Sequence, residues 1–231
     1  MKIHILSLLL VLTLNVVVQS ADAPFVIDFY MESLCPYCVQ FTTRSLKNFF
    51  AREGNEELAI INFVPYGNAK EAQRADGTFQ FTCQHGEPEC QGNLIETCAV
   101  NVLDRTSANS FIVCLESTYS GDFNAAKDKC LAHDQDSKSV IDQCLASEAA
   151  NALEHEMAQK TNSLQPPHRW VPWVVVDGAH DDKITDVADL VEYLCKKRSD
   201  RNELQICNSK IQYTHSVQLR FLSELPVCFR Q

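Results

Sequence analysis

A Cys-Pro-Tyr-Cys sequence at residues 35–38 constrains this chain more than any other feature. Two thiols separated by two residues can close a small disulfide ring and open it again. The pair follows a strand-like run, Phe25 to Tyr30, and precedes a helical pattern that continues to Phe50. A helix N-terminus favours the thiolate, the form that attacks disulfides, because its free N–H groups and partial positive charge stabilise an anion. The motif therefore predicts a redox pair where a strand meets a helix.

A Cys-x-x-Cys pair taken alone has two other interpretations, half of a zinc site and a structural bridge. Zinc needs a second ligand pair and suits a reducing compartment better. The strand and helix on either side favour redox chemistry.

Pro172 supports the redox interpretation. It lies at the start of a Val-rich run, where a proline cannot donate to a central ladder. A proline at a strand start is the plainer explanation. Because X–Pro bonds are those that adopt the cis form, we expect Val171-Pro172 to be cis and packed against the cysteine pair, with backbone groups free to pair with an extended substrate.

The N-terminus indicates the compartment. Residues 1–20 combine Lys2, an apolar run and small residues, which is typical of a secretory signal peptide. We expect cleavage after Ser20 rather than Ala23, because Pro24 would follow the second scissile bond. A membrane anchor is the alternative, but the run is short and lacks a basic flank, and no later segment is long and apolar enough to span a bilayer.

Eleven cysteines in a secreted chain predict disulfides. With the 35/38 pair set aside, eight can form four bridges whose connectivity the sequence leaves open, and the ninth, Cys228, becomes an unpaired thiol or the link of a disulfide-bonded dimer. The formal charge of −10 argues against nucleic acid and anionic membranes as partners. The eight are Cys83, Cys90, Cys98, Cys114, Cys130, Cys144, Cys195 and Cys207.

The order of elements indicates an α/β fold with a helical insertion. The first strand, the helix through Phe50 and a second strand at Leu58 to Val64 form a strand–helix–strand unit, which should be parallel and right-handed. Residues 66–168 hold six cysteines and helical patterns at 107–118 and 147–161. Strand character returns at 170–176, followed by a hairpin turn at Asp177-Gly178 and a helix at 186–197.

Residues 83–98 carry a long signature: Cys-Gln-His-Gly, two residues, Glu-Cys, two residues, Asn, four residues, Cys. It resembles the signature of the gamma-interferon-inducible lysosomal thiol reductase family. Residues 32–38, 64–69 and 166–173 are also similar to segments of that family, and the likeness covers roughly residues 24–207.

The resemblance implies a thioredoxin-like fold with a mainly helical, disulfide-braced insertion, in a DsbA-like arrangement. Residues 24–65 and 169–207 would form the core, 66–168 the insertion, and 208–231 a tail that could be a cleaved propeptide. It also implies reduction of protein disulfides in acidic endosomes or lysosomes, a link to host defence, and no cofactor beyond an external small-thiol or protein reductant. The chain has no Asn-x-Ser/Thr sequon, so targeting through N-glycans is not expected and secretion is an alternative.

We expect Cys35 to be the nucleophile, because it lies at the helix start, and Cys38 to resolve the mixed disulfide. A glutaredoxin-like enzyme, a disulfide-forming oxidase or isomerase, and a secreted binding protein with an inactive pair are the competing interpretations. The candidate docking residues are Val171, Pro172, Pro36 and Tyr37, and the candidate modulators are His85, which could equally be a solvated loop residue, Glu32 and Asp28.

Overall fold

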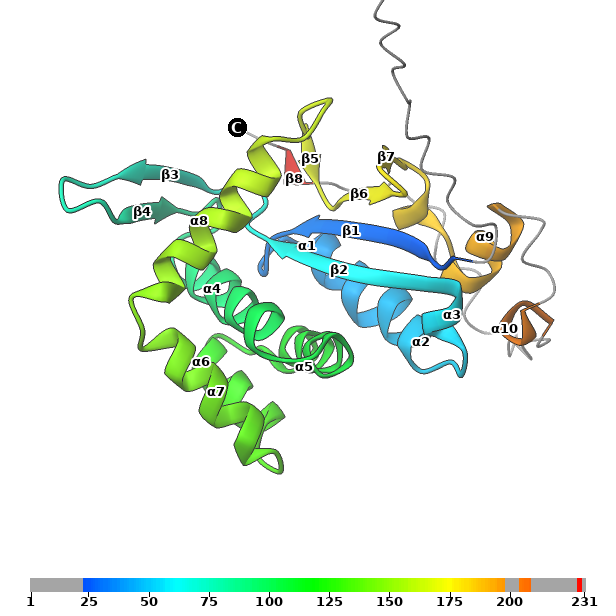
Figure 1. Ribbon diagram of the computed structural model, residues 1–231, viewed down its shortest axis with the longest axis horizontal. Coiled ribbons are helices and arrows are strands. Elements are labelled where there is room, and N and C mark those ends of the chain that lie inside the picture. Colours follow the sequence, from blue (N-terminus) through cyan, green and yellow to red (C-terminus); the bar gives the residue numbers. More distant parts are fainter. Residues whose placement is uncertain (1–22, 198–203, 209–227, 230–231) are drawn as a thin grey trace, which may run out of the picture.

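The computed structural model describes residues 23–197, 204–208 and 228–229 (Figure 1). The predicted signal peptide and most of the predicted tail lie outside these residues. Within them, no helix has the length and apolar character needed to span a membrane.

A four-stranded mixed sheet forms the centre of the molecule, in the order β2-β1-β6-β7. Strand β1 (Phe25–Met31) pairs in parallel with β2 (Ala59–Pro65) and antiparallel with β6 (Trp173–Val176), which continues to β7 (Ala179–His180). The two predicted early strands are confirmed. The predicted strand at 170–176 is divided at Pro172, which has no N–H to donate to a ladder. Its first part, β5 (Trp170–Val171), pairs instead with β8 (Cys228–Phe229).

The helix after β1 covers one face of the sheet. It runs without interruption from Pro36 to Phe50 as α1 (Pro36–Gln40), the π-helical η1 (Phe41–Leu46) and α2 (Lys47–Phe50). Phe29 of β1 meets Phe41 and Phe63 edge to face, with ring centroids 5.2 and 5.4 Å apart. The short α3 (Asn55–Leu58) then leads into β2.

The C-terminal part of the sheet follows local signals. Asp177 and Gly178 both have positive φ, as the predicted hairpin turn requires. The predicted final helix begins later than expected, at α9 (Leu190–Lys197), after a 3-10 turn, η2 (Ile184–Asp186). Asp189 accounts for this start, because its carboxylate accepts a hydrogen bond from the Val191 N–H at 2.9 Å. Cys195 of α9 is bonded to Cys207 of α10 (Gln205–Asn208).

The predicted insertion is mainly helical but opens with a β-hairpin, which is not among the predicted elements. This hairpin, β3 (Lys70–Gln73) and β4 (Phe79–Thr82), lies against α8 (Ala149–Asn162), where the Asn151 side chain makes hydrogen bonds to the Phe79 backbone, and its turn projects outward (Figure 1). Its strands are four residues long and largely polar, so they carry little strand signal. The helices that follow are α4 (Glu87–Val102), α5 (Arg105–Thr118), α6 (Phe123–Cys130), α7 (Gln135–Leu145) and α8 (Ala149–Asn162).

Disulfides brace the insertion. Cys98–Cys144 joins α4 to α7, and Cys114–Cys130 joins α5 to α6. A third bridge, Cys83–Cys90, closes the loop at the start of α4. The eight cysteines that we expected to pair with one another do so, in these three bridges and in Cys195–Cys207.

Three insertion helices bury carboxyl groups close together: Glu96 of α4, Glu116 of α5 and Glu154 of α8. Burial raises the pKa of Glu96 and of Glu154 to about 8. Burial also raises the pKa of Glu116 well above its usual range, and the neighbouring Glu96 adds to the effect. Since the folded-state pKa of Glu96 and of Glu154 lies above the unfolded value, their contribution to stability is fully present below the unfolded pKa, near 4.5, and is lost as pH rises through about 8. Glu116 acts in the same direction.

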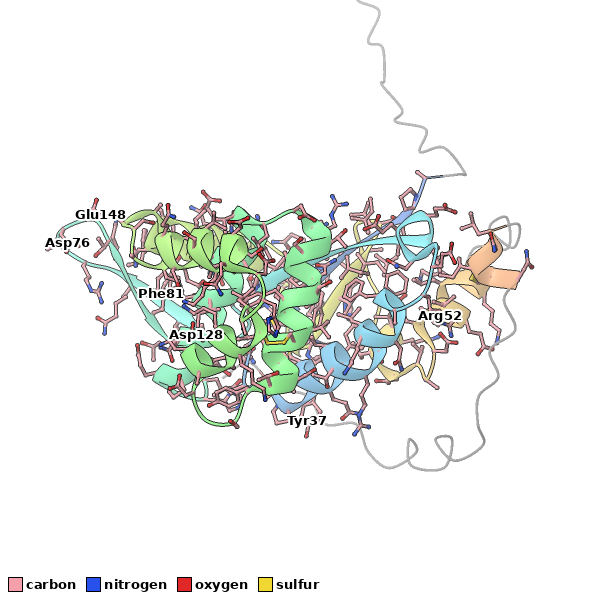
Figure 2. All side chains as sticks on the ribbon, turned by 90° about the horizontal axis from the view of Figure 1, so that it is seen from below. Tyr37, Arg52, Asp76, Phe81, Asp128 and Glu148 are labelled. Carbon is pink, nitrogen blue, oxygen red and sulfur yellow. A yellow bond between two sulfur atoms is a disulfide. The ribbon has the colours of Figure 1, made fainter. Side chains whose placement is uncertain are left out.

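We expect the free energy of unfolding to fall between about pH 5 and about pH 8, and the fall to be about 2–4 kcal/mol smaller in Glu154→Gln, which cannot ionise at this position. Urea titrations at the two pH values measure this difference. The matched control is Glu148→Gln, at an exposed position just before the same helix (Figure 2). If the free energy of unfolding fell equally between the two pH values in Glu154→Gln and in the unaltered protein, Glu154 would not ionise with a raised pKa in the folded state.

Candidate active site

The loop that carries the first cysteine of the pair is fastened to α4. The Ser33 N–H donates to Asn93 Oδ1 at 2.9 Å, and the Ser33 hydroxyl donates to the Glu89 carbonyl at 3.1 Å. Gly92 makes this approach possible, because a Cβ there would lie 2.3 Å from Ser33 Oγ and 2.6 Å from the Phe123 ring. The end of β1 is therefore held rigidly against the insertion.

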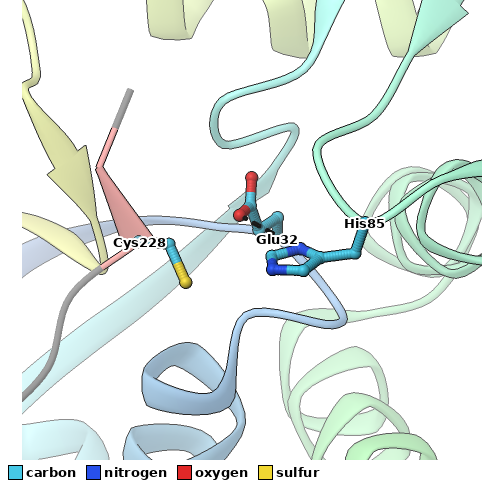
Figure 3. A group of neighbouring side chains, drawn as sticks. All are labelled: Glu32, His85 and Cys228. Carbon is cyan, nitrogen blue, oxygen red and sulfur yellow. Dashed lines mark ion pairs between the residues drawn. The ribbon is translucent and has the colours of Figure 1, made fainter. Parts of the chain in front are cut away.

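Polar groups converge beside this loop. Figure 3 shows the side chains of three residues lying close together: Glu32, which follows β1, His85, which precedes α4, and Cys228 of β8. Glu32 is fully buried, and its Oε1 lies 3.7 Å from His85 Nδ1. The Glu89 carboxylate holds His85 at two points. Its Oε1 accepts a hydrogen bond from the His85 backbone N–H at 3.0 Å, and its Oε2 lies 2.5 Å from His85 Nδ1.

The ligand-type atoms of Glu32, His85 and Cys228 lie within 4.8 Å of one another, a spacing that a metal ion could use. The Cys228 sulfur, however, is committed to a disulfide and is not a thiolate ligand. Glu32 and His85 therefore form a polar environment beside the disulfide sulfur atoms.

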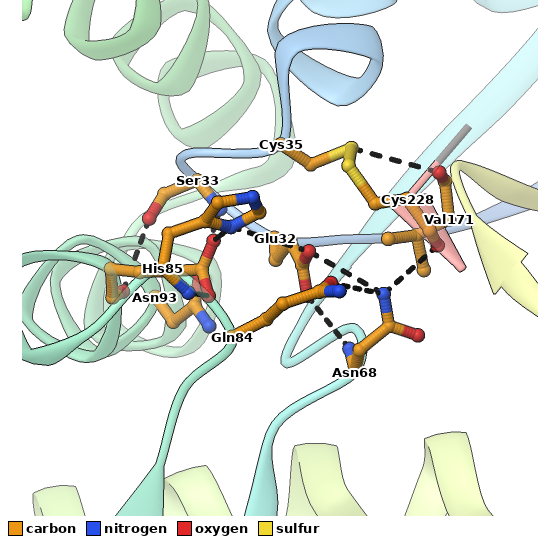
Figure 4. The surroundings of a disulfide bond; sticks show 10 residues. Glu32, Ser33, Cys35, Asn68, Gln84, His85, Asn93, Val171 and Cys228 are labelled. Atoms are coloured by element: carbon orange, nitrogen blue, oxygen red, sulfur yellow. Dashed lines mark hydrogen bonds and ion pairs between the residues drawn. A yellow bond between two sulfur atoms is a disulfide. The ribbon is translucent and has the colours of Figure 1, made fainter. Parts of the chain in front are cut away.

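Cys35 caps the N-terminus of α1, and Cys38 lies one turn later; both are buried. Cys35 is bonded to Cys228, with the two Cα atoms 6.1 Å apart (Figure 4). Cys38 is the free cysteine among the eleven, all of which lie in described parts of the chain. In this state the Cys-x-x-Cys pair is open, and its first sulfur is occupied by the C-terminal segment.

The interpretation of Cys228 as an unpaired thiol or the link of a dimer was wrong for this state. Antiparallel pairing of β8 with β5 places Cys228 opposite Val171, and this brings its sulfur to Cys35 across 193 residues of sequence. A sulfur used in this internal bridge cannot join two copies of the chain.

The predicted cis peptide bond at Val171-Pro172 is confirmed. The Val171 carbonyl oxygen lies 3.6 Å from Cys35 Sγ, a position from which it can accept a hydrogen bond from the Cys35 thiol when the bridge is open. Of the other predicted docking residues, Pro36 is exposed and Tyr37 is half-buried at the start of the helix, and their role in docking stays a prediction.

Two of the three predicted modulators lie near the sulfur atoms. Glu32 and His85 are placed there by the contacts above, but Asp28 is not. Successive side chains of a strand point to opposite faces, and Asp28 shares the face of Tyr30, away from the core that holds Cys35 and Cys38. Its carboxylate accepts a hydrogen bond from Asn62 at 2.8 Å instead.

The electrostatics of the site favour neutral groups. Burial, with the nearby Glu89 as a second cause, raises the pKa of Glu32 to about 8. Burial raises the pKa of the Cys38 thiol well above its usual range, and the charge of Glu32 raises it further. Below about pH 8, Glu32 is mostly protonated, so it carries no negative charge that would repel a Cys38 thiolate.

Asn68 is a site residue that is not among the predicted ones. Its N–H donates to Glu32 Oε2 at 2.8 Å, and its side-chain amide donates to Gln84 Oε1 at 2.8 Å and to the Cys228 carbonyl at 3.0 Å. The preceding Gly67 has a φ of 60°, and a Cβ there would lie 2.5 Å from Glu32 Oε2. A sequence signal for this position does exist. Gly67 and Asn68 come just after β2, and because parallel strands end at the same edge of a sheet, residues that follow β2 lie near those that follow β1.

Comparison with known proteins identifies the family. A family model described as "Gamma interferon inducible lysosomal thiol reductase (GILT)" matches residues 26–134. A Mus musculus protein named "Gamma-interferon-inducible lysosomal thiol reductase" is 35% identical over 189 residues, which cover 80% of this chain and 73% of the mouse protein. This chain belongs to the GILT family.

Two further GILT relatives differ in coverage. A Carassius auratus protein with the same name as the mouse one is 40% identical over 169 residues, 72% of this chain, and the match spans 64% of the goldfish protein's length. An Arabidopsis thaliana "Gamma-interferon-responsive lysosomal thiol protein" is 32% identical over 198 residues, 84% of this chain and 80% of its own.

The contact between α4 and the Cys35 loop can be tested with Gly92→Ala. Alanine normally stabilises a helix interior, but here the added methyl group must displace Ser33 and Phe123, so we expect a loss of about 1–3 kcal/mol in the free energy of unfolding. Denaturant titration measures it. Gln91→Ala, at the exposed neighbouring position of the same helix, is the control and should leave stability within about 0.5 kcal/mol. A stabilised Gly92→Ala protein would show that the contact is looser than described.

Proposed function

We propose that this chain is a thiol–disulfide oxidoreductase that reduces disulfides in protein substrates through Cys35 and Cys38. One observation carries the proposal: the Cys35 sulfur lies at a helix start, beside the carbonyl that precedes a cis-proline, and is bonded to the cysteine of an extended segment. The names of the GILT relatives, which describe thiol reductases, support the same activity.

A thioredoxin-like core with an insertion is the fold that we propose for this chemistry. In support, β1 and β2 are parallel and joined by the helix that starts at Cys35, while β6 is antiparallel and follows the cis-proline. Residues 24–65 and 169–207 would form this core and 66–168 the insertion, with a signal peptide at 1–20 and a tail at 208–231.

The reaction proceeds by two exchanges. The Cys35 thiolate attacks one sulfur of a substrate disulfide, the substrate S–S bond breaks, and the released substrate thiolate takes up a proton. Cys38 then loses its proton and attacks Cys35 Sγ, which breaks the mixed disulfide and leaves a Cys35–Cys38 bond. Two electrons have passed to the substrate, and an external thiol reductant must return two to the pair.

Acidic conditions suit the protonation states at this site. A free thiol with a reference pKa near 8.5 is almost wholly protonated in acid, so Cys35 depends on the helix N-terminus to hold its thiolate. Glu32 would oppose an anion if it were ionised, but its raised pKa leaves it mostly neutral below about 8. We therefore propose that the protein works in an acidic endosomal or lysosomal compartment, or in the extracellular space that a signal peptide also permits.

The assignment of Cys35 predicts that Cys35→Ser abolishes reduction of an insulin substrate by the pre-reduced full chain, at both about pH 5 and about pH 7.5. Cys38→Ser should lose multiple turnover while Cys35 still reacts once. Circular dichroism checks that both variants are folded. Undiminished turnover by Cys35→Ser would refute the assignment.

A further inference from the structure

The C-terminal segment is bound at the site in the manner of a substrate. Its backbone pairs antiparallel with β5, in the register Trp170 to Phe229 and Val171 to Cys228. Its sulfur is joined to Cys35, the predicted nucleophile, while Cys38 remains a buried thiol one helical turn away. The Cys35–Cys228 bond (Figure 4) therefore has the form of a mixed disulfide between the enzyme and a substrate, before the second cysteine of the pair attacks it.

One side chain recognises the backbone of the bound cysteine. Asn68 Nδ2 donates to the Cys228 carbonyl at 3.0 Å, from a side chain that is itself buried. Asn68 is held in turn by its backbone hydrogen bond to Glu32 and by Gln84. The bond to Cys35 requires a cysteine, and the hydrogen bond from Asn68 requires that its carbonyl lie in an extended backbone. Neither contact depends on the side chains of the neighbouring residues.

We propose that the segment at Cys228 is an internal substrate, and that β5 and Asn68 form the docking site for the extended, cysteine-containing segment of a protein substrate. Asn68 is then a positioning residue that fixes the carbonyl of the cysteine that Cys35 attacks. The inference rests on the proposed reductase function and adds how the substrate backbone is bound.

The internal segment can leave without an external reductant. Cys38 attacks Cys35 Sγ, the Cys35–Cys228 bond breaks, and a Cys35–Cys38 bond forms. One disulfide replaces another, so no net oxidation occurs. The proton that Cys38 loses is matched by the one that the departing Cys228 thiolate gains. When Cys35 of the reduced protein has formed a mixed disulfide with an external substrate, the Cys228 thiolate can attack Cys35 Sγ, release the substrate as a thiol and re-form the Cys35–Cys228 bond, in competition with Cys38.

A trapping experiment tests the competition. The probe is a synthetic peptide of residues 225–231 whose cysteine is activated as a mixed disulfide with 2-nitro-5-thiobenzoate. The pre-reduced full chain carries Cys38→Ser, alone or with Cys228→Ala, and intact mass reports the products. We expect the double variant to keep the peptide on Cys35, and the single variant to release it as Cys228 closes the internal bridge. Equal, stable peptide adducts on both variants would overturn the internal-substrate assignment.

A second measurement tests Asn68 in the pre-reduced Cys228→Ala background. The readout is the ratio of kcat/KM for the activated peptide to that for 5,5′-dithiobis(2-nitrobenzoate), which has no peptide backbone. Asn68→Ala should lower this ratio roughly five- to tenfold, the effect of losing one hydrogen bond. Asn62→Ala, which removes the partner of Asp28 instead, is the matched control.

The outcomes are separable. An unchanged ratio in Asn68→Ala overturns the role of Asn68. A folded Cys228→Ala protein that releases thiobenzoate from neither compound overturns the proposed reductase function, and this inference with it.

Discussion

The pairing of β1 on both of its edges is the constraint on which the site depends. Its parallel partner β2 ends at the same edge of the sheet and delivers Gly67 and Asn68 beside Glu32. Its antiparallel partner β6 begins at that edge and delivers the cis-proline. Three loops that are distant in sequence therefore meet at the sulfur of Cys35, and α4 closes the arrangement through Ser33.

Buried carboxyl groups recur in this molecule, both beside the cysteines and between the insertion helices. Transfer of a carboxylate out of water is costly unless a charge partner compensates, and burial is the first cause of the raised pKa at Glu32 and at Glu154. A neutral carboxylic acid avoids that cost. The same physical effect thus favours the folded insertion at low pH and removes a negative charge from the proposed active site.

Local sequence signals predicted much of the framework. The strand before Cys35, the cis bond at Pro172 and the Asp177-Gly178 turn each depend on a few neighbouring residues, and the structure contains all three. Signals of this kind do not report which distant segments pair. The partner of Cys228 is set by the β5–β8 ladder, and counting cysteines could not find it because the count assumed that Cys35 and Cys38 were bonded to each other. The prediction that Asp28 lies near the cysteines was wrong for a related reason. Which face of the sheet Asp28 occupies relative to the cysteines depends on where the first helix packs.

In the proposed reaction, the Cys35 sulfur is shared between Cys38 and the C-terminal Cys228. Disulfide mapping tests it most directly: the full chain, never reduced, is blocked with N-ethylmaleimide in acid, digested, and analysed by mass spectrometry. We expect a peptide containing Cys35 linked to one containing Cys228, with Cys38 alkylated only after denaturation. A Cys35–Cys38 link together with an alkylated Cys228 in the native protein would contradict it.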